Sequence, residues 1–204
     1  MTEYSDLKHR IAILASGGGS NASNLIRHFE DSAHVEIVLL GCNKPGAGAF
    51  QVAADAGIPS VPITRNDFYE TGTFLQLLLD AQIDWIILAG FLWKLPNNLV
   101  SSYSGKIINI HPSLLPKYGG KGMYGHFVHE AVHAAKENES GITIHFVDEH
   151  YDEGKIIFQA RVEIFPTDSP ADIEHNVREL EQIYFAQVVD DVLSVDILSQ
   201  SKKG

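Results

Sequence analysis

The sequence contains one cysteine, Cys42, among 204 residues, which excludes an internal disulfide framework and a multi-cysteine metal site. Cys42 follows an apolar run, where a free cysteine is ordinarily a small buried hydrophobe rather than a nucleophile. No apolar run approaches the roughly 20 residues that a membrane span needs. The first residues, MTEYSDLKHR, lack the basic and then apolar pattern of a signal peptide. We therefore expect a cytoplasmic protein without a membrane partner.

Basic residues are also scarce, because 15 Lys and Arg stand against 26 Asp and Glu, for a net charge of −11 at pH 7. A nucleic-acid partner is not expected, since phosphate backbones need clustered Lys and Arg. Hydrophobic residues make up 45% and charged residues 20% of the chain, as in an ordinary globular protein. The length suits one well-packed domain, and any phosphate that it binds must be held locally.

Short apolar runs alternate with amphipathic stretches, which is the pattern of βαβ units. It predicts a single-domain α/β fold with a Rossmann-like, mainly parallel twisted sheet of about seven strands and helices on both faces. Strands are expected at residues 10–15, 35–42, 60–62, 85–89, 106–110, 141–147 and 156–164. Helices are expected at 21–29, 48–56, 68–81, 125–136 and 170–194, with Asp67 and Ser169 as N-caps and Gly57 ending the second helix. The Gly-rich and Lys-rich segment 114–124 predicts a long loop that acts as a mobile lid.

The first strand leads through SGGGSN, residues 16–21, into a helix. Backbone N–H groups and the positive dipole end at such a helix start bind phosphate. The candidate phosphate-binding residues are Gly17, Gly18, Gly19, Ser20 and Asn21. The spacing of the glycines also fits a dinucleotide fingerprint, but the second strand ends without the carboxylate that would bind the nicotinamide ribose. A tight turn with an N-cap and no ligand is the alternative.

The segment INIHPSLLP, residues 108–116, follows a central strand, where open α/β sheets place their sites. Asn109 and His111 are two apart in an extended stretch, so both side chains point to the same face. Acyl transfer to an amine needs hydrogen-bond donors for the developing oxyanion and a group that moves protons. An amide and an imidazole together supply both. A buried structural histidine bonded to backbone would show the same spacing.

A carboxylate that sets the protonation of the imidazole is expected from the segment HFVDEHYDEG, residues 145–154. Asp148, Glu149, Asp152 and Glu153 all compete for this role. We favour Asp152, because it stands just before Gly154 in a turn between two apolar strands. The residues alone leave the choice open.

These segments resemble the folate-dependent glycinamide ribonucleotide formyltransferase family over nearly the whole chain. The matching pieces are SGGGSN, NKPGAGA, DWIILAGF, INIHPSLLP, and GITIHFV followed by DEG, in the family's order. The resemblance implies formyl transfer from 10-formyltetrahydrofolate to the glycyl amine of glycinamide ribonucleotide, in purine biosynthesis, without a metal. It also implies one formyltransferase domain over residues 1–204, with a phosphate-binding half at about 10–105 and a catalytic, folate-binding half at about 106–204. The oligomeric state, monomer or homodimer, stays open.

The resemblance assigns roles to particular residues. Asn109 and protonated His111 would stabilise the oxyanion, and Asp152 would hold His111 charged. The substrate phosphate would lie on residues 17–21, and Glu181 in the last helix would bind the ribose hydroxyls. The folate pocket would be formed by Phe91, Leu92, Trp93, Leu95, Asn109, Val147 and Asp152, with backbone groups near Leu92 and Leu95 reading the pterin edge. Trp93 and Lys94 depart from the family, where Arg followed by an apolar residue is common.

Several histidines need a separate interpretation. His126, His129 and His133 fall at helical spacings, and we expect a solvated helix surface rather than a metal face. Residues 123–126 are possible substrate contacts, and His145 in an apolar strand is expected to be a structural histidine close to the site.

Four other functions compete with this reading. They are another folate-dependent formyltransferase, of the methionyl-tRNA or sugar-nucleotide type, a formyltetrahydrofolate hydrolase, a dinucleotide-binding module and a noncatalytic binding protein. The transfer-RNA type is disfavoured because it needs a basic surface, and the dinucleotide module because the carboxylate after the second strand is missing.

Overall fold

The computed structural model describes residues 8–201, which form a seven-stranded sheet in the order β3-β2-β1-β4-β5-β6-β7. The strands are β1 (His9–Ala15), β2 (Val35–Cys42), β3 (Ser60–Pro62), β4 (Trp85–Leu88), β5 (Ile107–His111), β6 (Glu139–Phe146) and β7 (Ile156–Glu163). The first five strands pair in parallel, and β6 and β7 add an antiparallel edge. This is the Rossmann-like α/β fold predicted from the sequence.

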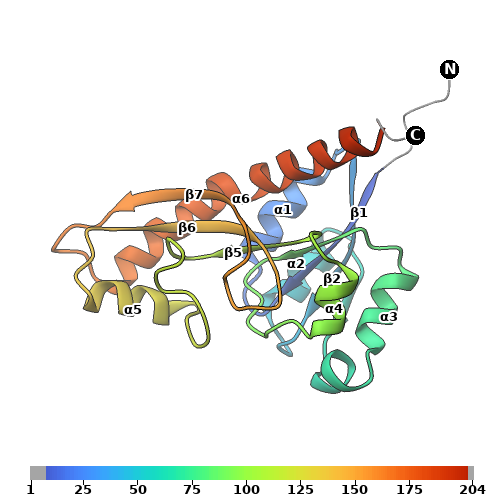
Figure 1. Cartoon of the computed structure of the whole chain (residues 1–204), viewed down its shortest axis with the longest axis horizontal. Helices are drawn as coiled ribbons and strands as arrows, with labels where there is room; N and C mark the ends of the chain where they lie inside the picture. The colour runs from blue at the N-terminus through green and yellow to red at the C-terminus, as the bar shows by residue number, and fades with distance from the viewer. Residues whose placement is uncertain (1–7, 202–204) are drawn as a thin grey trace.

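Helices cover both faces of the sheet, with α6 lying along one side and α3 and α4 on the other (Figure 1). They are α1 (Ser20–Phe29), α2 (Gly48–Asp55), α3 (Thr73–Asp80), α4 (Asn97–Ser102), α5 (His126–Ala134) and α6 (Pro170–Ser201), with a π-helical segment, η1 (Asn66–Glu70), before α3. In the described part of the chain, no helix is both long and apolar enough to cross a membrane.

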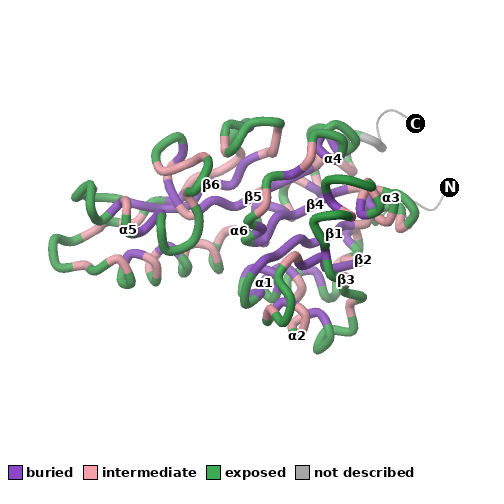
Figure 2. Tube along the Cα trace, turned by 90° about the horizontal axis from the view of Figure 1, so that it is seen from below, coloured by how far each residue is buried: buried purple, intermediate pink, exposed green. Residues whose placement is uncertain are grey.

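The hydrophobic core is split by the sheet into two layers. One layer packs α1, α2, α5 and α6 against the strands, and the other packs η1, α3 and α4. All four residues of β4 are buried, as are six of the seven in β1, which explains their continuous apolar sequence. The central strands form the purple interior in Figure 2, and the segments that follow them reach the green surface. These segments carry the candidate site.

The helix expected at residues 68–81 is wrong, because two segments occupy this stretch. Gly72 has a φ of 69°, a left-handed conformation that interrupts the helix between η1 and α3. Asp67 therefore lies inside η1 rather than capping a helix, and its backbone N–H donates to Thr64 Oγ1 at 3.2 Å. The short helix α4 was not expected at all.

The other expected caps are confirmed. Ser169 Oγ accepts the N–H of Asp172 at 3.3 Å, while the Asp172 carboxylate accepts the N–H of Ser169 at 2.9 Å, which is a capping box at the start of α6. Gly57, with a φ of 68°, follows the end of α2. Most other boundaries differ from the expected ones by one or two residues, so that β5, for example, includes His111. The largest difference is at the end of α6, which continues to Ser201.

Candidate active site

A cleft of about 830 Å³ opens where β1, β4 and β5 end, at the point where the strand order changes direction. Open α/β sheets bind their ligands at this switch point, because neighbouring loops diverge there. Its walls come from the segments after β1 and β4, from the ends of β5 and β6, from the lid around Gly120, and from α6. Every site residue expected from the sequence lines this one cleft.

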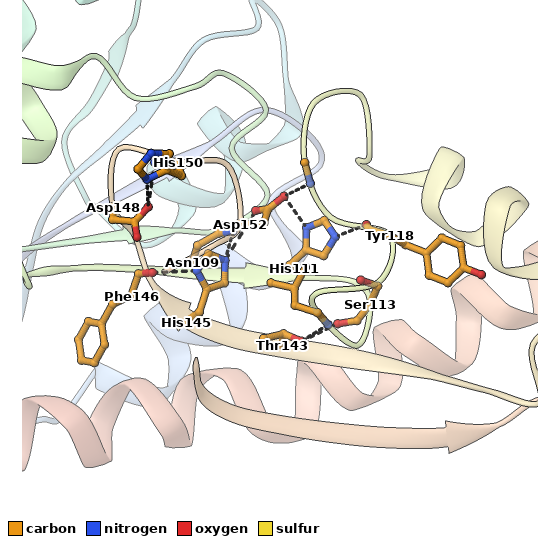
Figure 3. A network of polar contacts seen from close by, with 12 residues as sticks. Asn109, His111, Ser113, Tyr118, Thr143, His145, Phe146, Asp148, His150 and Asp152 are labelled. Carbon is orange, nitrogen blue, oxygen red and sulfur yellow. Dashed lines mark hydrogen bonds and ion pairs between the residues drawn. The ribbon is translucent and has the colours of Figure 1, made fainter. Parts of the chain in front are cut away.

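Asn109 and His145 form a cross-strand pair at the floor of the cleft, in the register of β5 and β6. The ring Nδ1 of His145 lies 2.8 Å from the carbonyl oxygen of Phe146, so this nitrogen must carry the proton. Nε2 is then an acceptor, and Asn109 Nδ2 donates to it at 3.1 Å (Figure 3). Burial lowers the pKa of His145, which keeps the ring neutral. His145 thus orients the Asn109 amide and is part of the site rather than only close to it.

His111 is buried and held from two sides. Its Nε2 donates to the carbonyl oxygen of Tyr118 in the lid at 2.8 Å. Its Nδ1 faces Asp152, with 3.6 Å to Oδ2 (Figure 3). The contact with Tyr118 is the backbone bond expected of a structural histidine, but a carboxylate faces the other ring nitrogen, which a purely structural histidine does not need.

Asp152 is the carboxylate that contacts both histidines. Its Oδ1 lies 3.7 Å from His145 Nε2, and Oδ2 accepts the backbone N–H of Gly120 at 2.8 Å. Asp152 has a φ of 56°, an uncommon conformation that aims its side chain into the cleft from the turn between β6 and β7. Its two oxygens therefore connect β5, β6 and the lid.

Among the described residues, the competing carboxylates make no hydrogen bond or ion pair with Asn109, His111 or His145, although Asp148 also lines the cleft. Asp148 accepts the backbone N–H of His150 at 2.8 Å and has a side chain 46% exposed, while Glu149 and Glu153 are exposed. The structure thus brings together the three residues that the sequence proposed, Asn109, His111 and Asp152, and separates the other acids from them.

The glycine loop forms another wall of the cleft. Gly19 has a φ of 87° and is the N-cap of α1, and a Cβ there would lie 2.9 Å from the backbone of Ala49. Only glycine fits this close approach between the loop and the start of α2. Gly17 and Gly18 have open space around them, so the loop exposes backbone to the cleft.

The side chain of Asn21 turns away from this loop and toward α6. Its Nδ2 donates to Glu181 Oε2 at 2.9 Å, and its Oδ1 accepts from Gln182 Nε2 at 3.0 Å. A phosphate on this loop would therefore meet the backbone of Asn21 rather than its side chain. Burial raises the pKa of Glu181, and the Asn21 amide offsets part of that effect.

An apolar wall follows β4. Phe91 and Leu95 are buried, Trp93 is half-buried, and Leu92 is 47% exposed. The Leu92 N–H donates to Ser16 Oγ at 2.9 Å, so it is already engaged within the protein. The guanidinium of Arg65 lies 4.7 Å from the centre of the Trp93 ring, which puts a cation beside this position although the family's arginine is absent.

Residues of α5 and α6 complete the cleft. Glu174, Val177, Arg178 and Glu181 follow a spacing of three, four and seven along one face of α6. Of these four residues only Glu181 was expected to line the site. The other three could have been found from the sequence, because residues three, four and seven positions before Glu181 share its face of the helix. His129 is 3% exposed and lines the cleft, so its expected place on a solvated helix surface is wrong. Its burial follows from Val128 and Val132, which pack the same face of α5.

The fold and cleft define the class of this protein, a Rossmann-like α/β enzyme with its site at the carboxyl ends of parallel strands. Residues 9–189 match the sequence profile of the formyl transferase family. The chain belongs to that family.

Relatives support the same assignment. The chain is 41% identical over 192 residues to the trifunctional purine biosynthetic protein adenosine-3 of Drosophila melanogaster, covering 91% of this chain but only 14% of that protein. It is 38% identical to the phosphoribosylglycinamide formyltransferase of Haemophilus influenzae, covering 86% of this chain and 83% of the relative. The crystal structure of glycinamide ribonucleotide transformylase 1 from Geobacillus kaustophilus is similar at a TM-score of 0.83, with 32% identity over 91% of this chain and 99% of that one.

Proposed function

We propose that this enzyme transfers the formyl group of 10-formyltetrahydrofolate to the glycyl amine of glycinamide ribonucleotide, giving formylglycinamide ribonucleotide and tetrahydrofolate in de novo purine biosynthesis. The proposal rests on one observation. Asn109, His111 and Asp152 lie together in one cleft, and a glycine loop of the kind that binds phosphate lines the same cleft. The names of the Haemophilus and Geobacillus proteins support the same reaction. The further activities of the trifunctional Drosophila protein are not carried over, because the chain spans 14% of its length.

The side chains of the floor suit attack by an amine on a formyl carbon. His145 fixes one N–H of the Asn109 amide, which leaves the second N–H to donate to the formyl oxygen as it gains negative charge. Protonated His111 would add a second, charged donor on the same face through Nδ1, with the Asp152 carboxylate as its countercharge. Nε2 already donates to Tyr118, whereas Nδ1 lies 3.6 Å from Asp152 Oδ2, too far for a hydrogen bond, and so stays available. The proton lost by the attacking amine and the one gained by the departing folate nitrogen move through these groups, directly or through water.

The apolar wall suits the folate. When bound, 10-formyltetrahydrofolate supplies the one-carbon group, and its flat pterin matches a surface of aromatic and aliphatic side chains. Such a surface is formed by Phe91, Leu92, Trp93, Leu95 and Val147, next to Asn109 and Asp152. With its N–H engaged by Ser16, Leu92 would read the pterin through its carbonyl group.

The glycine loop suits the acceptor. Backbone groups of Gly17, Gly18, Gly19, Ser20 and Asn21 at the start of α1 would bind the phosphate. Glu181, held by Asn21, would accept hydrogen bonds from the ribose hydroxyls. A net charge of −11 leaves the protein unsuited to nucleic acid, so small molecules are the partners that the charge favours. Cytoplasmic location, the oligomeric state and the division into two functional halves stay predictions.

Glu181→Gln tests the ribose contact and the burial of this acid together. Because the pKa of Glu181 is raised, the folded state holds its proton more tightly than the unfolded chain, and stability falls as pH rises through the raised pKa. At pH 7 the variant should therefore have a higher melting temperature than the wild type, with the difference disappearing near pH 4. Its KM for glycinamide ribonucleotide should rise about tenfold, since a hydrogen bond to a charged acceptor is weakened.

Thermal unfolding at both pH values and initial rates measure these effects. Glu179→Gln is the matched control, because Glu179 is on the same helix with its side chain 65% exposed. A lower melting temperature at pH 7 together with an unchanged KM would contradict both assignments.

The proposed reaction is tested by incubating the protein with 10-formyltetrahydrofolate and following loss of the formyl group by absorbance, with and without glycinamide ribonucleotide. Turnover that depends on the nucleotide is expected. Loss of formyl without the nucleotide would instead indicate a formyltetrahydrofolate hydrolase, and no turnover in either case would refute the proposal.

A further inference from the structure

His129 is a buried polar side chain in the wall of the cleft whose chemistry the reaction described above does not use. The residue is 3% exposed and sits on α5, one turn after the lid joins the helix. Its ring Nδ1 is buried and has no hydrogen-bond partner in the described part of the protein. A buried, unpartnered ring nitrogen costs free energy, so its place beside a ligand cleft points to a partner that binds there.

The surroundings of His129 keep its ring neutral. Burial lowers its pKa, and the positive charge of Arg178 acts in the same direction, against the carboxylate of Glu174. A neutral imidazole offers one N–H donor and one acceptor. Such a ring can make one hydrogen bond to an amide, either by donating its N–H to the amide oxygen or by accepting the amide N–H.

Position along the cleft identifies the part of the acceptor that His129 would meet. Glu181 is tied to Asn21 beside the glycine loop, while Glu174, seven residues earlier, lies near His129. Seven residues of helix span about 10 Å. An acceptor with its phosphate on the glycine loop and its amine at His111 must run along the face of α6 that carries Glu174 and Glu181. His129, close to both Glu174 and His111, lies toward the reacting end of that path.

We propose that His129 recognises the acceptor by hydrogen bonding to the amide that joins the ribose to the glycyl amine. This inference rests on the proposed function and adds a specificity residue to it. The contact also connects the lid to the substrate, because α5 begins at His126, directly after the lid. His129 thus selects an acceptor that carries an amide, while the glycine loop and Glu181 select its ribose phosphate.

The test compares His129→Ala and His129→Asn with the wild type in the formyl-transfer assay. We expect alanine to raise the KM for glycinamide ribonucleotide about tenfold, the equivalent of one hydrogen bond, and to change the KM for the folate less than twofold. Asparagine, which retains a donor and an acceptor, should recover part of the loss. His133→Ala is the matched control, because His133 is exposed one turn further along α5, and its kinetics should equal those of the wild type.

Ribose 5-phosphate, used as a competitive inhibitor, locates the contact. It lacks the amide, so its inhibition constant should be the same for the wild type and His129→Ala. If His129→Ala changed the inhibition constant of ribose 5-phosphate and the KM values of both substrates by the same factor, and also lowered the melting temperature, His129 would be only structural. That result would overturn the inference. An unchanged KM for glycinamide ribonucleotide would overturn it as well. Failure of the wild type to use glycinamide ribonucleotide would instead overturn the proposed function, so the two failures are distinguishable.

Discussion

Replacing His111 with alanine is expected to lower kcat by about 10³-fold, within the usual range for removing a general acid-base group. In the proposed reaction this side chain would supply a charged donor on the face where Asn109 would supply a neutral one, and Asp152 lies 3.6 Å from its Nδ1. Alanine removes this donor and leaves Asp152 without the imidazole that it faces. Because the donor acts mainly on the developing oxyanion, the KM values for both substrates should change much less than kcat.

Single-turnover and steady-state rates of formyl transfer measure this loss. His150→Ala provides a matched control, because His150 also lines the cleft but its side chain is 65% exposed and pairs with Asp148 instead. Circular dichroism should show that both variants keep the fold. A kcat of His111→Ala within fivefold of the wild type would exclude His111 from the chemistry and leave the alternative that it only fastens the lid through Tyr118.

The fold was predictable because its signal is local and repeated. The buried strands β1 and β4 are apolar along their whole length, and the glycine loop marks the first βα junction. What the sequence hid was the break between η1 and α3. Thr71 and Gly72 interrupt an otherwise helical pattern there, and one glycine inside such a pattern does not by itself show that the chain turns left-handed.

The candidate site was predictable where two residues share one strand, as Asn109 and His111 do. Asp152 was less certain, because its side chain reaches the floor through a left-handed turn that sequence spacing does not reveal. The partnership of Asn21 with Glu181 joins residues 160 positions apart, and only packing of α1 against α6 brings them together. His129 was misread because three histidines at helical spacing do not show which of them faces the core, although the neighbouring valines indicate it.

Gly154→Ala is expected to lower kcat about 100-fold without touching any side chain of the site, because a shift of about 1 Å in a positioned group has an effect of that size. Gly154 is buried beside β6, and a methyl group there would overlap the carbonyl oxygen of Phe146. That oxygen accepts the Nδ1 proton of His145 at 2.8 Å and so fixes the tautomer that holds Asn109. Asp152 precedes Gly154 by two residues in the same turn, so it would move as well.

The same overlap should lower the free energy of unfolding by about 1–3 kcal/mol, as overpacking against backbone commonly does. Gly17→Ala is the control for this measurement, since nothing lies within 4 Å of the added methyl group and its unfolding free energy should match the wild type. Denaturant unfolding and kcat should be measured on the same preparations, because a variant that is destabilised but still folded separates the two effects. If Gly154→Ala loses stability and retains full kcat, the turn adapts without moving Asp152 or His145, and their placement does not depend on this close contact.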